Sequence, residues 1–290
     1  MRQIKSSELI LNKDGSIYHL HLKPEHISEN IILVGDQDRV PKVARHFDSV
    51  RFETQKREFK TMTGSIQNRD FTVISTGIGP DNIDIVINEL DALVNINLEN
   101  RTIKDKLTSL NIVRIGTSGS LQKNIPVDSF VLAKYGLGLD GMLLDYRCEH
   151  IQEKEMENAF IDHTNYSPDK SRPYILKNSD FLEQKLISED VFSGITATAE
   201  GFYGPQGRVI RLPVKDSDLF NKIESFNFHE LQITNMEMET SAIYGLSTLL
   251  GHKALSMNAI IGNRRTMSFS NHPNKTVENL IQYTLNKLSI

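Results

Sequence analysis

Apolar runs that end in glycine-containing segments recur along the first half of the chain. They predict strands over residues 31–35, 71–79 and 112–120, and the first and third are nearly continuous, as in parallel strands covered on both faces. Amphipathic patterns at 39–47 and 81–94 follow the first two runs and predict helices. Strand, glycine turn and helix in repetition predict an α/β fold.

The second half of the chain continues this alternation. Further strands are predicted over 128–139, 188–203 and 254–265, and helices over 233–254 and 274–290. Residues 145–190 are polar and mixed, which predicts surface loops. No internal repeat or low-complexity linker interrupts the pattern, so we expect residues 1–290 to form a single domain.

Composition narrows the function classes. The 290 residues carry 33 basic and 37 acidic side chains, a formal net charge of −4, which gives no reason to expect binding to nucleic acid or to an anionic membrane. No stretch approaches the roughly 20 apolar residues of a membrane span, and the N-terminus lacks a signal-peptide pattern. Cys148 is the only cysteine, and the nine histidines show no metal-binding spacing. We therefore expect a cytoplasmic protein without a metal site.

Two arginines stand beside the glycine segments. Arg114 lies inside an apolar strand, where its charge needs an anionic partner, either a ligand or a core carboxylate. Arg39 lies in a first helical turn, where it either holds the same ligand or is simply solvated. In open α/β sheets, ligands bind beyond the carboxyl ends of the strands, and glycine turns let backbone N–H groups approach an anion. No phosphate-binding loop or dinucleotide-binding pattern is present.

Two later segments carry polar groups that suit a small polar ligand. Gln206 and Arg208, in the Gly/Pro segment 202–208, could bind the carbonyl and N–H edge of a planar heterocycle, or could belong to a surface turn. Glu237 and Glu239 could include one carboxylate that points into a pocket, or could both be acids favoured at a helix N-terminus. Arg264 ends a late apolar strand.

Together, and in this order, eight segments resemble the nucleoside phosphorylase family, and within it the uridine phosphorylase type. They are residues 18–22, 34–40, 57–59, 75–79, 114–122, 202–208, 236–242 and 263–264. Three features depart from the family pattern: Pro80 replaces a common glycine, Gly204-Pro205 reverses the frequent order, and the stretch at 145–190 is longer.

The resemblance implies a three-layer α/β/α sandwich around a mixed, partly closed sheet. It implies cleavage of uridine or a related pyrimidine nucleoside by inorganic phosphate, as the cosubstrate, with no other cofactor. Phosphate would be held by Gly35, Arg39, Arg57, Arg114 and Thr117. Ribose would be held by His19, Glu237, Met238 and Glu239. The base would be framed by Ser118, Gly119, Phe202, Gln206, Arg208 and Arg264. Arg114, Glu239, Gln206, Arg208 and Arg264 would carry the catalysis.

The resemblance also implies that His19 and Arg57 come from a neighbouring chain, so that a homodimer is the smallest active unit; dimers of this type often assemble into hexamers. Three alternatives stay open at this point. A purine nucleoside phosphorylase or a nucleosidase would share the fold, and a non-catalytic nucleoside-binding protein would keep it without the reaction. The three phosphate-site arginines favour phosphate over water as the nucleophile, and Gln206, Arg208 and Arg264 favour a pyrimidine.

Overall fold

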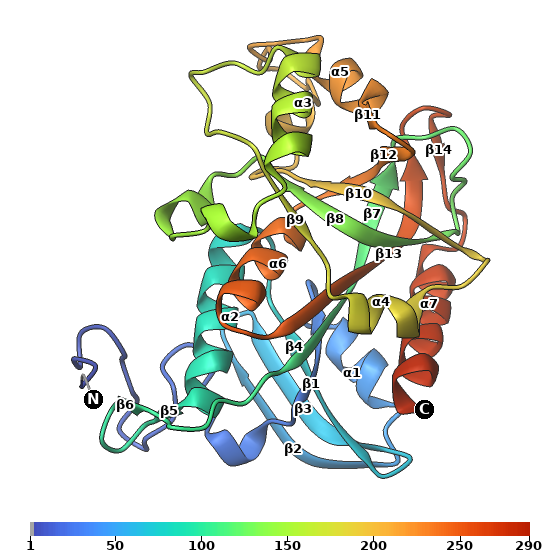
Figure 1. Cartoon of the computed structure of the whole chain (residues 1–290). Coiled ribbons are helices and arrows are strands. Elements are labelled where there is room, and N and C mark those ends of the chain that lie inside the picture. Colours follow the sequence, from blue (N-terminus) through green and yellow to red (C-terminus); the bar gives the residue numbers. More distant parts are fainter. Residues whose placement is uncertain (1–2) are drawn as a thin grey trace.

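In the computed structural model, which describes residues 3–290, strand β1 (Asn30–Val34) is buried on both faces. Ile31 and Leu33 point into one hydrophobic cluster, and Ile32 and Val34 point into another. Alternate side chains of a strand point to opposite faces, so a continuous apolar run needs a cover on each side. The two clusters are the interfaces between a central sheet and its two helical layers (Figure 1).

Twelve strands form the sheet, in the order β11-β12-β10-β8-β13-β7-β1-β4-β3-β2, with β14 paired to β13 and β9 to β8. Their bounds are β1 (Asn30–Val34), β2 (Ser49–Lys56), β3 (Phe59–Ile66), β4 (Arg69–Ser75), β7 (Asn111–Ser120), β8 (Phe130–Gly138), β9 (Tyr174–Lys177), β10 (Val191–Thr198), β11 (Asn227–Phe228), β12 (Leu231–Glu237), β13 (Lys253–Asn263) and β14 (Ser268–Phe269). A separate pair joins β5 (Ile96–Asn97) to β6 (Thr102–Ile103). Strand β12 also pairs with β7, which closes five strands into a ring.

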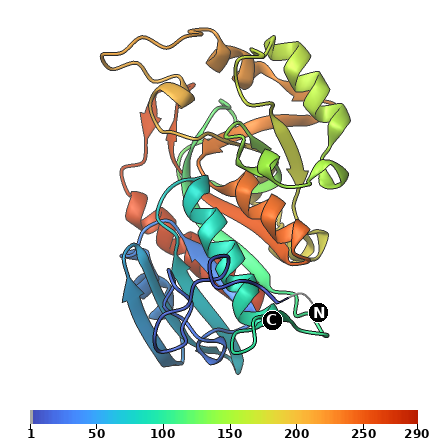
Figure 2. The same ribbon diagram turned by 90° about the vertical axis from the view of Figure 1, so that its left-hand side faces the viewer.

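Seven α-helices accompany the strands within residues 3–290. They are α1 (Arg39–Ala44), α2 (Pro80–Asn95), α3 (Lys154–Thr164), α4 (Asp180–Leu186), α5 (Leu219–Ser225), α6 (Thr240–Leu249) and α7 (Pro273–Ser289). Helices α2 and α6 pack side by side on one face of the sheet, as Figure 2 shows, and α1, α4 and α7 supply the cluster on the other. The three layers and the mixed, partly closed sheet confirm the expected fold class.

The predicted helix over 233–254 is wrong in its first third. Residues Leu231–Glu237 form strand β12, and the helix α6 begins only at Thr240. Ile233, Thr234 and Asn235 are all buried, because β12 has neighbours on both edges and cores on both faces. Because several of the buried positions of β12 are polar, its sequence shows no hydrophobic period of a strand or a helix, and the sequence pattern could not separate the two elements.

Surface loops over 145–190 are also a wrong prediction. The stretch contains a 3-10 helix (Glu149–Ile151), α3, β9 and α4, joined by irregular links. Met156 and Phe160 lie four residues apart, on one face of α3, and both pack into a cluster against β10 and β12. Their polar neighbours cover the outer face of that helix, and the high polar content reflects this exposure.

The glycines of the third apolar run lie within a strand, where a turn was expected. Gly116 and Gly119 both belong to β7, which continues to Ser120. The first two runs do end in turns at the carboxyl ends of β1 and β4, and β1 pairs in parallel with both β4 and β7. The pattern analysis also overlooked the β2–β3 hairpin, since β2 lies at the sheet edge with mostly polar, partly exposed residues.

No helix within residues 3–290 is long and apolar enough to cross a lipid bilayer.

We expect Tyr244→Phe to destabilise the protein, because the buried Tyr244 hydroxyl joins two strands. It donates to the Ala133 carbonyl of β8 (2.6 Å) and accepts from the Ser256 N–H of β13 (2.9 Å). Removing it leaves two buried backbone groups without this partner, which costs about 1–3 kcal/mol of unfolding free energy. Urea unfolding of the variant measures the loss. Tyr203→Phe, which removes a hydroxyl from an exposed ring, is the control and should change little.

Candidate active site

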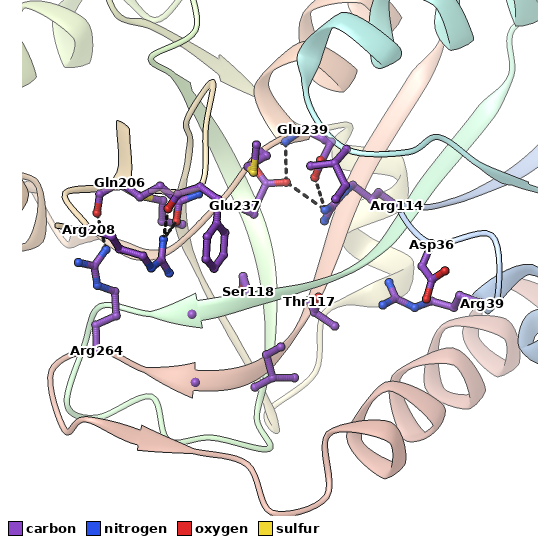
Figure 3. A pocket seen from close by; sticks show the side chains of 18 of the residues that line it. Asp36, Arg39, Arg114, Thr117, Ser118, Gln206, Arg208, Glu237, Glu239 and Arg264 are labelled. Atoms are coloured by element: carbon purple, nitrogen blue, oxygen red, sulfur yellow. Dashed lines mark hydrogen bonds and ion pairs between the residues drawn. The ribbon is translucent and has the colours of Figure 1, made fainter. Parts of the chain in front are cut away.

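A cavity of about 760 Å³ opens at the carboxyl ends of β1 and β4 and runs along β7. This is where open α/β sheets bind ligands, and the size suits a small molecule. Thirteen of the fifteen predicted site residues line it: Gly35, Arg39, Arg114, Thr117, Ser118, Gly119, Phe202, Gln206, Arg208, Glu237, Met238, Glu239 and Arg264. Figure 3 shows these side chains in two groups, with Arg39 and Arg114 towards one end and Gln206, Arg208 and Arg264 at the other.

Arg114 is buried and paired with two carboxylates. Its Nη2 lies 2.5 Å from Glu239 Oε2 and 3.4 Å from Glu237 Oε2, and its Nη1 donates to Asn258 Oδ1 (3.0 Å). Burial alone would lower the pKa of Arg114, but the two carboxylates outweigh it and raise that pKa. Of the two partners open from the sequence, the core carboxylate is present, and Arg114 still lines the cavity.

Gly116 makes room for this arrangement. Arg114 and Gly116 lie two residues apart on one strand, so both face the same side of β7. A Cβ atom at Gly116 would lie 1.8 Å from Arg114 Nη1 and 2.5 Å from its Cζ. The guanidinium therefore folds back over Gly116, where a side chain would displace it from its two carboxylates, which explains the glycine inside this strand.

Glu237 and Glu239 have different amounts of hydrogen-bonding capacity left. Glu237 ends β12 and accepts from the Thr198 hydroxyl (2.7 Å) and from the N–H groups of Glu239 and Thr240, so it caps helix α6. Glu239 accepts from Arg114 and from the N–H of Gly79 at the start of α2 (2.8 Å). A carboxylate has about four acceptor positions, so Glu239 keeps capacity for a ligand, whereas protein donors use most of that of Glu237.

The electrostatics around Glu239 follow from its burial. Loss of water raises the pKa of Glu239, the charge of Arg114 opposes this shift, and the charge of Glu237 adds to it. The N-termini of α2 and α6 both meet at this carboxylate, and their partial positive charge favours its ionised form.

Arg39 lies nearby without a carboxylate partner within ion-pair distance among residues 3–290. Its Nη1 donates to the Ile115 carbonyl (3.1 Å), and burial and the charge of Arg114 both lower its pKa. Gly35 and Thr117 lie beside it on the pocket wall. A cation next to a second cation, with backbone and hydroxyl donors around it, is a suitable environment for an anion.

The other end of the pocket holds two more arginines near each other. Arg208 Nη1 donates to the Phe202 carbonyl (2.6 Å) and to Gln206 Oε1, and Arg264 Nη1 donates to the Gln206 carbonyl (2.6 Å). Burial and the charge of Arg208 lower the pKa of Arg264 to about 10. Within residues 3–290, neither guanidinium has a carboxylate within ion-pair distance, so this end can stabilise negative charge on a ligand.

Ser118 lies between the two ends, and its hydroxyl has a fixed role. Asn235 Nδ2 donates to Ser118 Oγ (2.8 Å), while Thr196 and Thr234 donate to Asn235 Oδ1. The amide orientation is therefore set by its neighbours, and the Ser118 proton is left to donate to a ligand.

His19 and Arg57 do not line this pocket. His19 Nδ1 lies 2.6 Å from Glu89 Oε1 of α2, and Arg57 lies in the β2–β3 turn with φ near 55°. Both approach the Tyr18 ring: the His19 and Tyr18 ring centroids are 4.8 Å apart, and Arg57 Cζ is 5.9 Å from the Tyr18 centroid. The chain thus gathers these two residues at one place outside its own pocket.

The sequence interpretation left out eleven lining residues, four of them chain neighbours of predicted ones: Asp36, Gln37, Glu58, Gly77, Ile78, Met236, Ile261, Gly262, Asn263, Met267 and Phe269. Met267 and Phe269 are 86% and 81% exposed, so they form an apolar rim at the mouth. Nothing in a local pattern marks an exposed methionine or phenylalanine as part of a pocket.

Comparisons with known proteins agree with this geometry. The model of the phosphorylase superfamily matches residues 29–286. A uridine phosphorylase of Thermococcus kodakarensis is 27% identical over 267 residues, covering 91% of this chain and 83% of that protein. A purine nucleoside phosphorylase of Alkaliphilus metalliredigens is 25% identical over 240 residues, covering 82% and 84%. The crystal structure of a Trypanosoma brucei nucleoside phosphorylase that shows uridine phosphorylase activity superposes with a TM-score of 0.88, at 28% identity, covering 97% and 99%.

Fold, pocket and matches define an enzyme that transfers a pentosyl group. The chain belongs to the phosphorylase superfamily.

We expect Arg114→Met to lower the unfolding free energy by about 3–5 kcal/mol at pH 8, because two buried carboxylates lose their cation. The loss should shrink towards pH 5. Without Arg114 the pKa of Glu239 rises further above its unfolded value, so the folded state binds a proton more tightly and gains stability as pH falls. Thermal or urea unfolding across this range measures the effect.

The matched control is the double variant Arg114→Met/Glu239→Gln, which removes one of the two charges left behind. It should recover part of the stability at pH 8 and flatten the pH dependence. A loss that stays constant from pH 5 to pH 8 would show that the Arg114 charge does not balance these carboxylates.

Proposed function

We propose that this enzyme cleaves uridine, or a closely related pyrimidine nucleoside, with inorganic phosphate to give uracil and ribose 1-phosphate. The observation that carries the proposal is the pair Arg208 and Arg264 beside Gln206, which have no carboxylate partner among residues 3–290. Uracil offers carbonyl oxygens and an N–H to such a set of donors and acceptors. The relatives named as uridine phosphorylases support the same substrate class.

The pocket suits a mechanism without a covalent intermediate. Cleavage of a nucleoside bond develops positive charge on the ribose, as in glycoside cleavage. Glu239 has acceptor capacity left for ribose hydroxyls, and its negative charge favours the cationic ring. Phosphate bound by Arg39, Arg114, Thr117 and the Gly35 backbone would attack the anomeric carbon. The reaction requires no cofactor besides phosphate.

The departing base takes the bonding electrons and becomes an anion. Its charge spreads to the carbonyl oxygens, where Gln206, Arg208 and Arg264 can stabilise it as it forms. Donors aimed at developing charge are often worth about 3–4 kcal/mol each. The like charges of Arg208 and Arg264 repel each other while the pocket holds no anion, so an anionic base relieves this repulsion.

We expect uracil release from uridine to require phosphate. The measurement is product formation with and without phosphate, over a panel of uridine, 2′-deoxyuridine, thymidine and inosine. Uridine should be cleaved far faster than inosine. Equal rates with and without phosphate would indicate a nucleosidase, inosine cleavage without uridine cleavage would indicate a purine enzyme, and binding without turnover would indicate a non-catalytic protein.

The active unit is proposed to be at least a homodimer. His19 and Arg57 lie together around Tyr18, and neither lines its own chain's pocket, as expected of residues that complete a partner's site. Among residues 3–290, no carboxylate lies within ion-pair distance of Arg57, which leaves its charge available to an anion in a second chain.

We expect inactive Arg57→Ala and Arg208→Ala chains to complement each other when subunits exchange. In a mixed dimer one site carries both defects and the other carries neither, so activity should recover towards a fraction of the wild-type value. The measurement is uracil release after mixing, with exchange verified by native mass spectrometry. Absence of recovery despite exchange would place Arg57 outside the partner's site.

A further inference from the structure

Arg264 is held by a ring and a carbonyl. Its Cζ lies 3.5 Å from the centroid of the Phe220 ring, and its Nη1 donates to the Gln206 carbonyl (2.6 Å). The adjacent Arg265 is held differently, with Nε 3.1 Å from Glu224 Oε1. Glu224 therefore pairs with Arg265, which does not line the pocket, and leaves Arg264, which does.

One helix holds both arginines. Phe220 and Glu224 lie four residues apart on α5, so their side chains emerge from the same face. The helix presents an uncharged ring to Arg264 and a carboxylate to Arg265. This division leaves Arg264, at the pocket wall, without an ion pair among residues 3–290.

A ring fixes a guanidinium without competing for its donors. An aromatic face attracts the cation from above the guanidinium plane, while the N–H groups point outwards within that plane. A carboxylate would accept from those same N–H groups and would neutralise the charge. Phe220 thus orients Arg264 and leaves it able to receive an anion.

Phe220 contacts the Arg264 guanidinium from outside the pocket. It is not among the residues that line the pocket, unlike Phe202, which lies under Arg208 (3.9 Å from Cζ to the ring centroid) and does line it. The loop before Arg208 fits closely against α5: a Cβ at Gly207 would lie 3.0 Å from Phe220 Cβ, and Gly207 has a φ of +69°. Helix α5 and the Gln206 loop therefore form one packed unit around Arg264.

We propose that Phe220 is a positioning residue, which holds the Arg264 guanidinium where it stabilises the negative charge that develops on the leaving base. The inference rests on the proposed pyrimidine phosphorolysis. It assigns a role in leaving-group stabilisation to a residue that does not contact the substrate.

The test compares two substrates whose leaving bases depend to different degrees on a stabilising cation. Fluorine at position 5 makes the departing uracil more acidic, so 5-fluorouridine depends less on a stabilising cation than uridine does. We expect Phe220→Leu to lower kcat/KM for uridine by about tenfold or more, mainly through kcat, because small displacements of catalytic groups are costly. The loss with 5-fluorouridine should be several times smaller.

Two variants serve as controls. Phe220→Tyr keeps the ring and should retain nearly wild-type rates on both substrates. Phe181→Leu removes a ring that lies under Lys185 and Lys253 (5.5 and 5.3 Å to the centroid) on α4, and should leave both rates unchanged. In the Arg264→Leu variant, adding Phe220→Leu should lower kcat/KM little further, because the guanidinium that Phe220 positions is already absent.

Equal losses on the two substrates, or a full further loss in the Arg264→Leu background, would overturn the positioning role and leave the proposed reaction standing. If Phe220→Leu does not fold, Phe220→Met, which fills the space without an aromatic face, takes its place: a larger loss with uridine than with 5-fluorouridine supports the proposal, and equal losses or none contradict it. If the wild type releases no uracil from either nucleoside with phosphate, the proposed function and this inference both fail.

Discussion

The pairing of Arg114 with Glu237 and Glu239 is the interaction on which the pocket depends. A buried arginine without a partner would cost several kcal/mol, and so would each carboxylate. The three charges join β7, the end of β12 and the start of α6, and the Gly79 N–H connects α2 to the same cluster. Because each charge needs the others, these elements cannot shift independently, and the wall of the pocket is fixed before any ligand binds.

The arginines at the two ends of the pocket have different kinds of partner. At one end a cation is balanced by carboxylates, and Arg39 adds a second cation without such a partner in the described part of the chain. At the other end Arg208 and Arg264 are held by aromatic rings and carbonyl groups, and neither has a carboxylate within ion-pair distance in residues 3–290. A substrate that gains positive charge at its sugar and negative charge at its base would fit this arrangement.

The sheet topology places both ends within reach of one ligand. Closure of the ring between β12 and β7 brings Met236 beside Gly119, so that Glu237 and Glu239 follow directly above the strand that carries Arg114. An open sheet in the same strand order would leave β12 four strands away from β7. Partial closure is thus the feature of the fold that brings Glu237 and Glu239 to Arg114.

The sequence alone determined the α/β class, since continuous apolar runs require a cover on both faces of each strand, and it located most of the segments that line the pocket, although not the rim at Met267 and Phe269. It did not reveal the partner of Arg114, because Glu239 lies 125 positions away and a charge pattern does not encode pairing. It did not separate β12 from α6, because a segment buried all round has no period. Only the tertiary structure showed that Phe220 supports Arg264, since an aromatic residue in a polar stretch has no local signature until its helix packs against the loop that holds Gln206.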